Sequence, residues 1–85
     1  MEIFYWPKFA KYFKKLPVEI QKKAVEKEKV FKKNPFDPRL KTNKLHGELS
    51  EYWSFSINYK IRIIFKFINK STVGFYLIGD HDIYE

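Results

Sequence analysis

The spacing of the apolar residues changes once along this chain, close to Glu48, and the change limits the folds that the chain can adopt. After it the period is two, with one set of side chains apolar and the alternate set more polar: Trp53, Phe55 and Ile57 against Tyr52, Ser54 and Ser56. That alternation predicts a half-buried strand. Residues 60–68 and 72–79 predict two further strands, separated by an Asn-Lys-Ser turn. Three consecutive strands of this kind favour an antiparallel meander.

Before Glu48 the apolar residues follow the helical period. Four of them lie at i, i+3, i+4 and i+7, on one stripe of a helix: Phe9, Tyr12, Phe13 and Leu16. Pro17 ends this helix and suits the first turn of a second one. The second helix is expected over about residues 17–33, with one apolar side made by Ile20, Ala24 and Phe31.

Two segments flank the helices. The opening MEIFYW is β-prone and is closed by Pro7, so it predicts a short strand at the edge of the sheet. Residues 34–47 are rich in proline and asparagine and predict an ordered loop. The expected fold is α+β in the order β-α-α-β-β-β, with two N-terminal helices packed on an antiparallel sheet of three or four strands.

Length and composition fit one small domain spanning residues 1–85, with 45% hydrophobic and 20% aromatic residues to build its core. The chain has no cysteine, which excludes a disulfide scaffold and a thiolate metal site. No apolar run approaches the roughly 18 residues of a membrane span, and the N-terminus lacks a signal-peptide pattern. We therefore expect a cytoplasmic protein with no membrane contact.

The net charge of +7 is unevenly distributed. Residues 1–44 hold 13 Lys and Arg against 5 Asp and Glu, whereas residues 45–85 hold 4 against 5. A lysine-rich helical face exposed to solvent explains such an excess without any function. A surface for a polyanion or an acidic partner explains it equally well, because a one-sided field steers binding.

Arg62 is one of only two arginines in the chain and lies in the middle of the strand expected at 60–68. It shares a face with Ile64, opposite the apolar face that contains Ile63. A surface ion pair with Glu48 or Glu51 is one interpretation. The other is phosphate recognition, since a guanidinium offers paired donors and does not deprotonate.

The end of the chain, LIGDHDIYE, contains the second candidate, His81. In an extended segment Asp80 and Asp82 would point to one side and His81 to the other, so the three would not converge on a metal ion. A solvated terminal histidine is the simplest interpretation. Alternatively His81 is a proton carrier, because an unperturbed histidine titrates near ~6.5 and neighbouring carboxylates favour the imidazolium.

The segments KKLPVEIQKKAVEK, NPFDPRLKTNKLHGELSEYWSFSINYKIRIIFKF and VGFYLIGDHDIY together resemble the RelE/ParE superfamily of toxins from type II toxin–antitoxin systems. The likeness is greatest to the RelE/StbE, YoeB and YafQ group and covers nearly the whole chain. It implies two helices against an antiparallel sheet. It also implies a ribosome-dependent endoribonuclease, an mRNA interferase that needs no cofactor or metal, inhibits translation and is silenced by a cognate antitoxin.

In this family the ribose 2′-hydroxyl attacks the adjacent phosphate, which calls for a base, a cation and an acid. The resemblance gives Arg62 the role of the cation, His81 that of the general acid, and Tyr84 that of an aromatic that orients the substrate. Asn43 stands where relatives carry a basic glutamate or histidine, and an asparagine cannot take up a proton. The base or accessory group is then sought among His46, Glu48 and Lys60. Three lysines are candidates for RNA contacts: Lys41, Lys44 and Lys66.

The resemblance gives the lysine-rich helices two compatible partners, ribosomal RNA and an acidic antitoxin segment that folds on binding. The missing base leaves two alternatives open. One is a non-enzymatic ParE-like toxin that binds DNA gyrase. The other is a catalytically weakened member that only binds RNA or the antitoxin.

Overall fold

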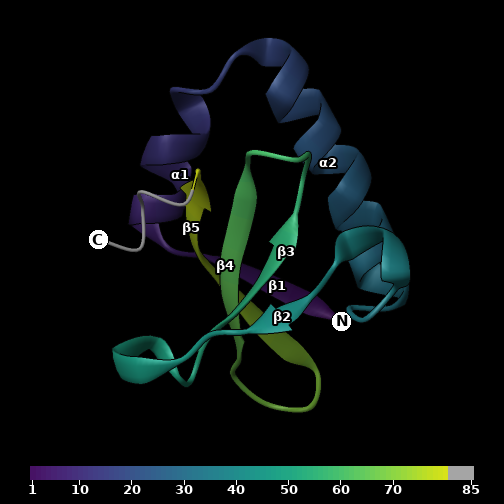
Figure 1. The fold of residues 1–85 in the computed structure, drawn as a ribbon, viewed down its shortest axis with the longest axis vertical. Helices are drawn as coiled ribbons and strands as arrows, with labels where there is room; N and C mark the ends of the chain where they lie inside the picture. Colours follow the sequence, from purple (N-terminus) through teal and green to yellow (C-terminus); the bar gives the residue numbers. More distant parts are fainter. Residues whose placement is uncertain (81–85) are drawn as a thin grey trace.

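The computed structural model describes residues 1–80 (Figure 1). Its elements follow one another as β1 (Glu2–Tyr5), α1 (Pro7–Lys14), α2 (Val18–Lys33), the 3₁₀ turn η1 (Pro38–Leu40), β2 (Asn43–Lys44), the 3₁₀ turn η2 (Gly47–Leu49), β3 (Trp53–Ser56), β4 (Arg62–Phe67) and β5 (Thr72–Gly79). This is the expected α+β fold. Within residues 1–80, neither helix is long and apolar enough to cross a membrane.

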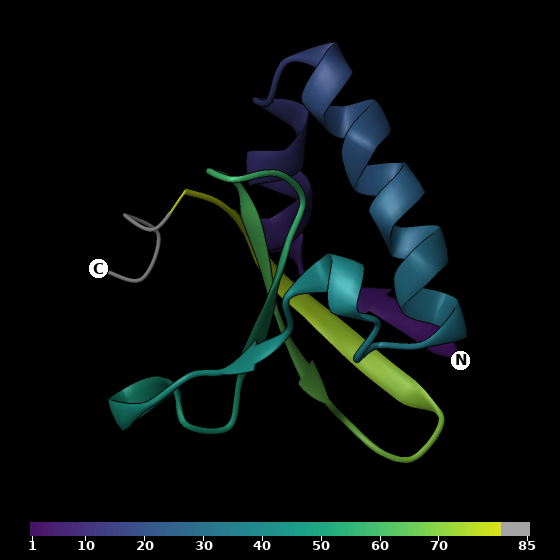
Figure 2. The same cartoon turned by 45° about the vertical axis from the view of Figure 1, so that its right-hand side comes forward.

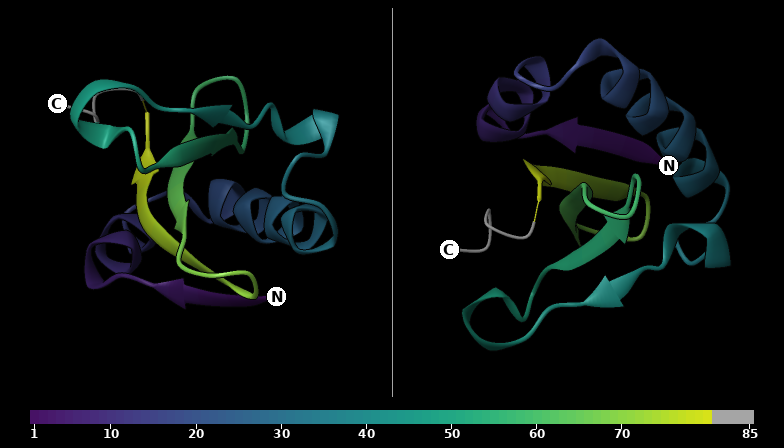
Figure 3. Two further views of the ribbon diagram at one scale, coloured as in Figure 1. Left: turned by 90° about the horizontal axis from the view of Figure 1, so that it is seen from below. Right: turned by 45° about the horizontal axis from the view of Figure 1, so that its top comes forward.

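The five strands form one sheet in the order β1-β5-β4-β3-β2. The meander of β3, β4 and β5 is antiparallel as predicted. The N-terminal strand does lie at an edge, but it runs parallel to β5 because the two helices carry the chain back across the sheet. One strand was not predicted. It is β2, which is only two residues long and lies inside the segment expected to be a loop. Figure 3 shows β1 and β2 at opposite margins of the sheet.

Both helices pack on the same face of the sheet, which is the core face (Figure 2). Phe31 of α2 is fully buried against the rings of Phe55, Phe65 and Phe75, with centroids at 4.8, 4.8 and 5.4 Å. The ring centroid of Phe9 in α1 lies 5.5 Å from that of Phe75. In the described part of the chain, neither α1 nor α2 lies on the opposite face, which we call the open face.

The two helices are separated where the prolines predict. α1 ends at Lys14 and α2 begins at Val18, after Pro17. The carbonyl groups at the end of α1 lack helical partners, and the side-chain amide of Gln21 donates hydrogen bonds to those of Phe13 and Leu16, at 3.1 and 2.9 Å. The turn is therefore closed by a side chain from the next helix.

The segment between α2 and β3 is ordered, as expected. Asp37 begins η1 by accepting hydrogen bonds from the backbone and the guanidinium of Arg39, and these bonds lower the pKa of the Asp37 carboxyl to about 2. Lys41 then adopts a left-handed backbone with φ 51°, which turns the chain into β2. Asn43 and Lys44 pair there with Ser54 and Trp53.

β5 departs from regular pairing at one residue. Ile64 of β4 pairs with Leu77 while Phe65 pairs with Phe75, so Tyr76 is an extra residue, a β-bulge. Because the bulge absorbs one residue, Phe75 stays on the core face and Tyr76 joins Leu77 on the open face. Two residues earlier Gly74 also faces this side, where Trp6 covers it.

The lack of a side chain at Gly74 is a packing requirement. A Cβ atom there would lie 2.0 Å from Cζ3 of Trp6 and 2.7 Å from its Cη2. We expect Gly74→Ala to lower the free energy of unfolding by about 1–3 kcal/mol, because the indole must shift. Urea unfolding of Gly74→Ala, Trp6→Leu and the double variant measures the effect. The double variant should lose less than the sum of the single losses, and full additivity would contradict the steric explanation.

Candidate active site

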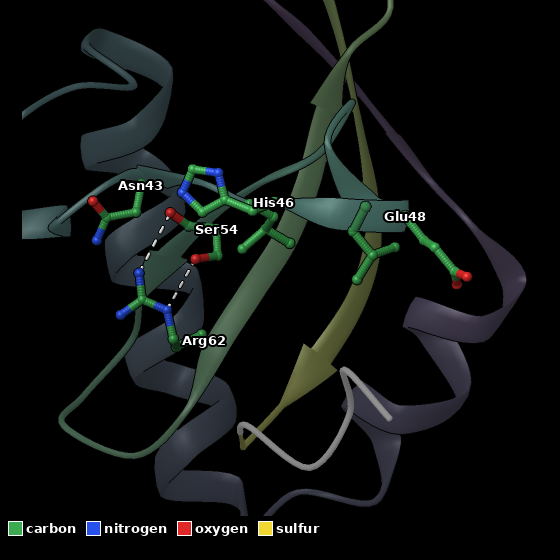
Figure 4. A pocket seen from close by; sticks show the side chains of 7 residues that line it. Asn43, His46, Glu48, Ser54 and Arg62 are labelled. Carbon is green, nitrogen blue, oxygen red and sulfur yellow. Dashed lines mark hydrogen bonds between the residues drawn. The ribbon is translucent and has the colours of Figure 1, made fainter.

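Arg62 begins β4 and points to the open face, together with Ser54 and Ser56 of the neighbouring strand β3. Its Nε donates to Oγ of Ser54 at 3.0 Å, and one terminal nitrogen donates to Oγ of Ser56 at 2.6 Å. The other terminal nitrogen donates to the carbonyl oxygen of Lys41 at 3.0 Å. Figure 4 shows the two hydrogen bonds that join the guanidinium to Ser54.

All of these acceptors are neutral oxygens. Within residues 1–80, Arg62 forms no ion pair, and Glu51 instead lies 3.8 Å from Nζ of Lys66. The interpretation of Arg62 as a surface ion pair with Glu48 or Glu51 is therefore wrong. A guanidinium that is fixed by hydrogen bonds but not neutralised keeps its positive potential for an incoming anion.

A pocket of about 550 Å³ opens beside the guanidinium. Its lining comes from β2, η2 and the two central strands: Asn43, Leu45, His46, Glu48, Leu49, Ser54 and Arg62. Three of the predicted accessory residues, Asn43, His46 and Glu48, thus share one pocket with Arg62. In Figure 4 the His46 ring lies on the side of Asn43 and Ser54, whereas Glu48 points away from the guanidinium.

Backbone geometry brings these distant residues together. The left-handed residue Lys41 offers its carbonyl oxygen both to Arg62 and to the side-chain amide of Asn43, at 3.0 and 3.4 Å. Gly47 has φ 72°, a conformation that glycine adopts without strain, and it turns the chain into η2 so that His46 and Glu48 flank the turn. The turn at Lys41, β2 and η2 therefore all lie close to the Arg62 guanidinium.

The other predicted site residues lie elsewhere. Lys60 is exposed in the turn between β3 and β4 and does not line the pocket. The Lys41 side chain lines a separate, smaller pocket, which it shares with Lys23, Lys27 and Arg39.

The remaining predicted residues divide into two pairs. The ammonium groups of Lys44 and Lys66 lie over the rings of Trp53 and Tyr52, at 5.9 and 5.5 Å from the centroids. His81 and Tyr84 lie outside the described residues. In the described part of the chain, no three His, Asp or Glu side chains are close enough together to hold a metal ion.

Sequence reasoning missed Ser54 and Ser56 as the groups that hold the guanidinium. The signal for them was present, since the alternation that predicts β3 puts both serines on one face. Their pairing opposite Arg62 needed the strand register, which pairs Ser56 with Arg62 and Ser54 with Ile64. Leu45 and Leu49, the apolar part of the pocket lining, were missed because their approach to Arg62 depends on the turns at Lys41 and Gly47.

We expect Ser56→Ala to lower the free energy of unfolding by about 1 kcal/mol, because the half-buried guanidinium loses its shortest hydrogen bond. Urea unfolding measures the loss. Ser50→Ala is the matched control, since Ser50 is exposed at the end of η2 and its side chain is not among the hydrogen-bond partners of the guanidinium. Equal stability of the two variants would contradict a fixing role for Ser56.

The fold is shared with solved toxin structures. The chain aligns over 95% of its length with 99% of the YoeB/ParE toxin from Agrobacterium tumefaciens, at TM-score 0.81 and 16% identity. It aligns over 98% with 96% of YafQ from E. coli strain BL21(DE3), at TM-score 0.81 and 17% identity. It aligns over 95% with 97% of a chain of the YoeB-YefM complex from Staphylococcus aureus, at TM-score 0.75 and 24% identity. No protein-family model and no curated protein matches its sequence.

Proposed function

We propose that this chain, which has the RelE/YoeB-like toxin fold, is the toxin of a type II toxin–antitoxin pair and cleaves mRNA on the ribosome. The observation that supports cleavage is the Arg62 guanidinium, which is held by neutral oxygens at the wall of the pocket. A guanidinium has five N–H donors. Within residues 1–80, the four hydrogen bonds of Arg62 leave one donor for a phosphate oxygen, and no carboxylate pairs with the guanidinium.

In the proposed reaction the ribose 2′-oxygen attacks the adjacent phosphorus and the bond from phosphorus to the 5′-oxygen breaks. The products are a 2′,3′-cyclic phosphate and a free 5′-hydroxyl. Arg62 stabilises the charge that develops on the phosphorane oxygens. By resemblance, His81 gives its proton to the departing 5′-oxygen, and Tyr84 orients the substrate. A substrate without a 2′-hydroxyl cannot react in this way, so RNA is cut and DNA is not.

For the base we propose His46. Asn43 lines the pocket but cannot accept a proton, and its amide is directed to the carbonyl of Lys41. Glu48 lines the same pocket but points away from Arg62 (Figure 4). Lys60 lies outside the pocket. These placements favour His46 over the other three candidates.

The proposed partners are an antitoxin, the ribosome and mRNA. The cationic N-terminal half supports this, because the exposed lysines of α2 offer a field for ribosomal RNA or for an acidic antitoxin segment. The Staphylococcus aureus relative was solved as a YoeB-YefM complex. We therefore expect a gene for an antitoxin beside the gene for this chain.

We expect Arg62→Ala and His81→Ala each to relieve growth arrest and to lower the rate of mRNA cleavage by about 10²–10³-fold, as loss of one group that stabilises transition-state charge or transfers a proton does. Primer extension on a translated mRNA after induction measures cleavage. Arg39→Ala is the matched control, because Arg39 is the other arginine of the chain and is exposed beside Asp37. Circular dichroism checks that each variant folds.

Two outcomes would overturn the proposal. Full toxicity of both Arg62→Ala and His81→Ala would remove these groups from the mechanism. Intact mRNA together with a DNA-damage response would identify a ParE-like toxin that acts on DNA gyrase. Growth arrest that tracks mRNA fragments, and that disappears with Arg62, supports an endoribonuclease.

The base is tested separately. We expect His46→Ala to slow cleavage by about 10²-fold or more, the range of general base catalysis, whereas Glu48→Ala leaves it within a few-fold of wild type. Single-turnover cleavage across a pH series compares the two variants with the parent chain. His46→Ala should lose the rise of rate with pH that the parent shows. A loss confined to Glu48→Ala would transfer the role to Glu48.

A further inference from the structure

Four aromatic side chains follow one another across the open face of the sheet, and the proposed reaction uses none of them. The centroid of Phe4 is 5.3 Å from that of Trp6, Trp6 is 5.9 Å from Tyr76, and Tyr76 is 5.1 Å from Tyr52. We call these four residues the aromatic row. It crosses from the edge strand β1, over β5, to the residue that precedes β3.

The fold builds the row with two local devices. Gly74 pairs with Phe4 on one side and with Lys66 on the other, and its missing side chain leaves the space that the Trp6 indole fills. Tyr76 follows Phe75 of the core face and so lies on the open face, where it meets Tyr52, and the bulge in β5 keeps Leu77 on that face beside it. Without the bulge, alternation from Phe75 would leave Tyr76 on the open face but return Leu77 to the core face.

The rings of the row are not enclosed as the core rings are. Phe4 is 53% exposed, and Trp6, Tyr52 and Tyr76 are half-buried. On the core face, by contrast, Phe31, Phe55, Phe65 and Phe75 have no exposed surface. Within residues 1–80 neither α-helix covers this face, so an aromatic series with exposed surface there is able to receive a ligand.

One cation belongs to the row. The ammonium group of Lys66 lies 5.5 Å from the centroid of the Tyr52 ring and 3.8 Å from a carboxylate oxygen of Glu51, an exposed side chain whose place at Lys66 a bound phosphate would take. Lys66 and Arg62 lie on the same face of β4, four residues apart, which corresponds to about 13 Å along a strand. The row and the Arg62 pocket are therefore neighbouring parts of one face.

We propose that the aromatic row binds single-stranded RNA next to the Arg62 pocket, with bases stacked on Tyr52 and Tyr76 and a phosphate at Lys66. A nucleic acid strand alone offers both planar faces for the rings and repeated anionic groups for the cation. The inference rests on the proposed function for the source of the RNA, which is the mRNA that Arg62 acts on.

Other occupants fit less well. An acidic peptide would satisfy Lys66 and leave the rings in water. A second copy of the chain, joined by a two-fold axis, would bring the row, with Lys66 and the neighbouring Arg62, against the same groups of its partner. The repulsion between these like charges disfavours that arrangement.

Binding can be measured without cleavage. The probe is a fluorescein-labelled 12-nucleotide oligouridine with 2′-O-methyl groups, which cannot undergo attack by a 2′-oxygen. We expect fluorescence anisotropy to show Tyr76→Ala and Tyr52→Ala each raising Kd by roughly 5- to 100-fold, the range for one stacked base. Tyr76→Phe and Tyr52→Phe should bind like the parent chain, because stacking needs the ring and not the hydroxyl. Tyr59→Ala is the control, since Tyr59 is fully exposed in the turn before β4.

The phosphate contact has its own measurement. Lys66→Ala should reduce the slope of log Kobs against log salt by about 0.7, the value for one phosphate of a single strand, and Lys70→Ala should change it less. In a Trp53→Phe background the remaining indole is Trp6, at one end of the row. Its fluorescence should be quenched when the probe binds.

Three results would overturn the proposal. The first is no binding of the probe by the folded parent chain. The second is unchanged affinity in Tyr76→Ala and Tyr52→Ala when thermal melting shows that both fold. The third is self-association, seen by analytical ultracentrifugation, that these variants abolish while probe affinity stays constant. Because the probe cannot be cut, a failure here leaves the mRNA-cleavage result for Arg62→Ala standing, and a failure of cleavage leaves the binding result standing.

Discussion

The contact on which the rest of the structure depends is the packing of Phe31 against the rings of the three central strands. Phe55, Phe65 and Phe75 each contribute one ring, and all are fully buried. Because side chains alternate along a strand, fixing these rings on the core face also fixes which residues emerge on the open face. Shifting β3 or β4 by one residue would put Arg62 and the serines on opposite faces.

On the open face, polar groups from several segments then surround the Arg62 guanidinium. Neutral oxygens of Ser54, Ser56 and Lys41 orient the Arg62 guanidinium without cancelling its charge. An ion pair would have held the side chain equally well, but its carboxylate would compete with an incoming phosphate. The same face continues into the aromatic row, so the Arg62 pocket and four aromatic rings lie side by side on the sheet face that neither α1 nor α2 covers.

Much of the fold could be predicted from residue spacing. The stripe of Phe9 and Phe13, the break at Pro17 and the alternation after Glu48 gave the helices and the meander, because each pattern is local. β2 could not be predicted, since two residues are too few to show a period. The parallel pairing of β1 with β5 depends on how two helices return the chain, which no local pattern records.

The sequence by itself determined which residue types were available: an arginine in a strand, alternating serines in its neighbour, and at position 43 an asparagine, which cannot act as a base. Only the tertiary structure decided that Ser54, Ser56 and Lys41 hold Arg62, that His46 and Glu48 share its pocket, and that Tyr52 meets Tyr76. The physical reason is that alternation assigns a residue to a face, whereas proximity on that face depends on strand register, on the bulge in β5 and on the left-handed turn at Lys41.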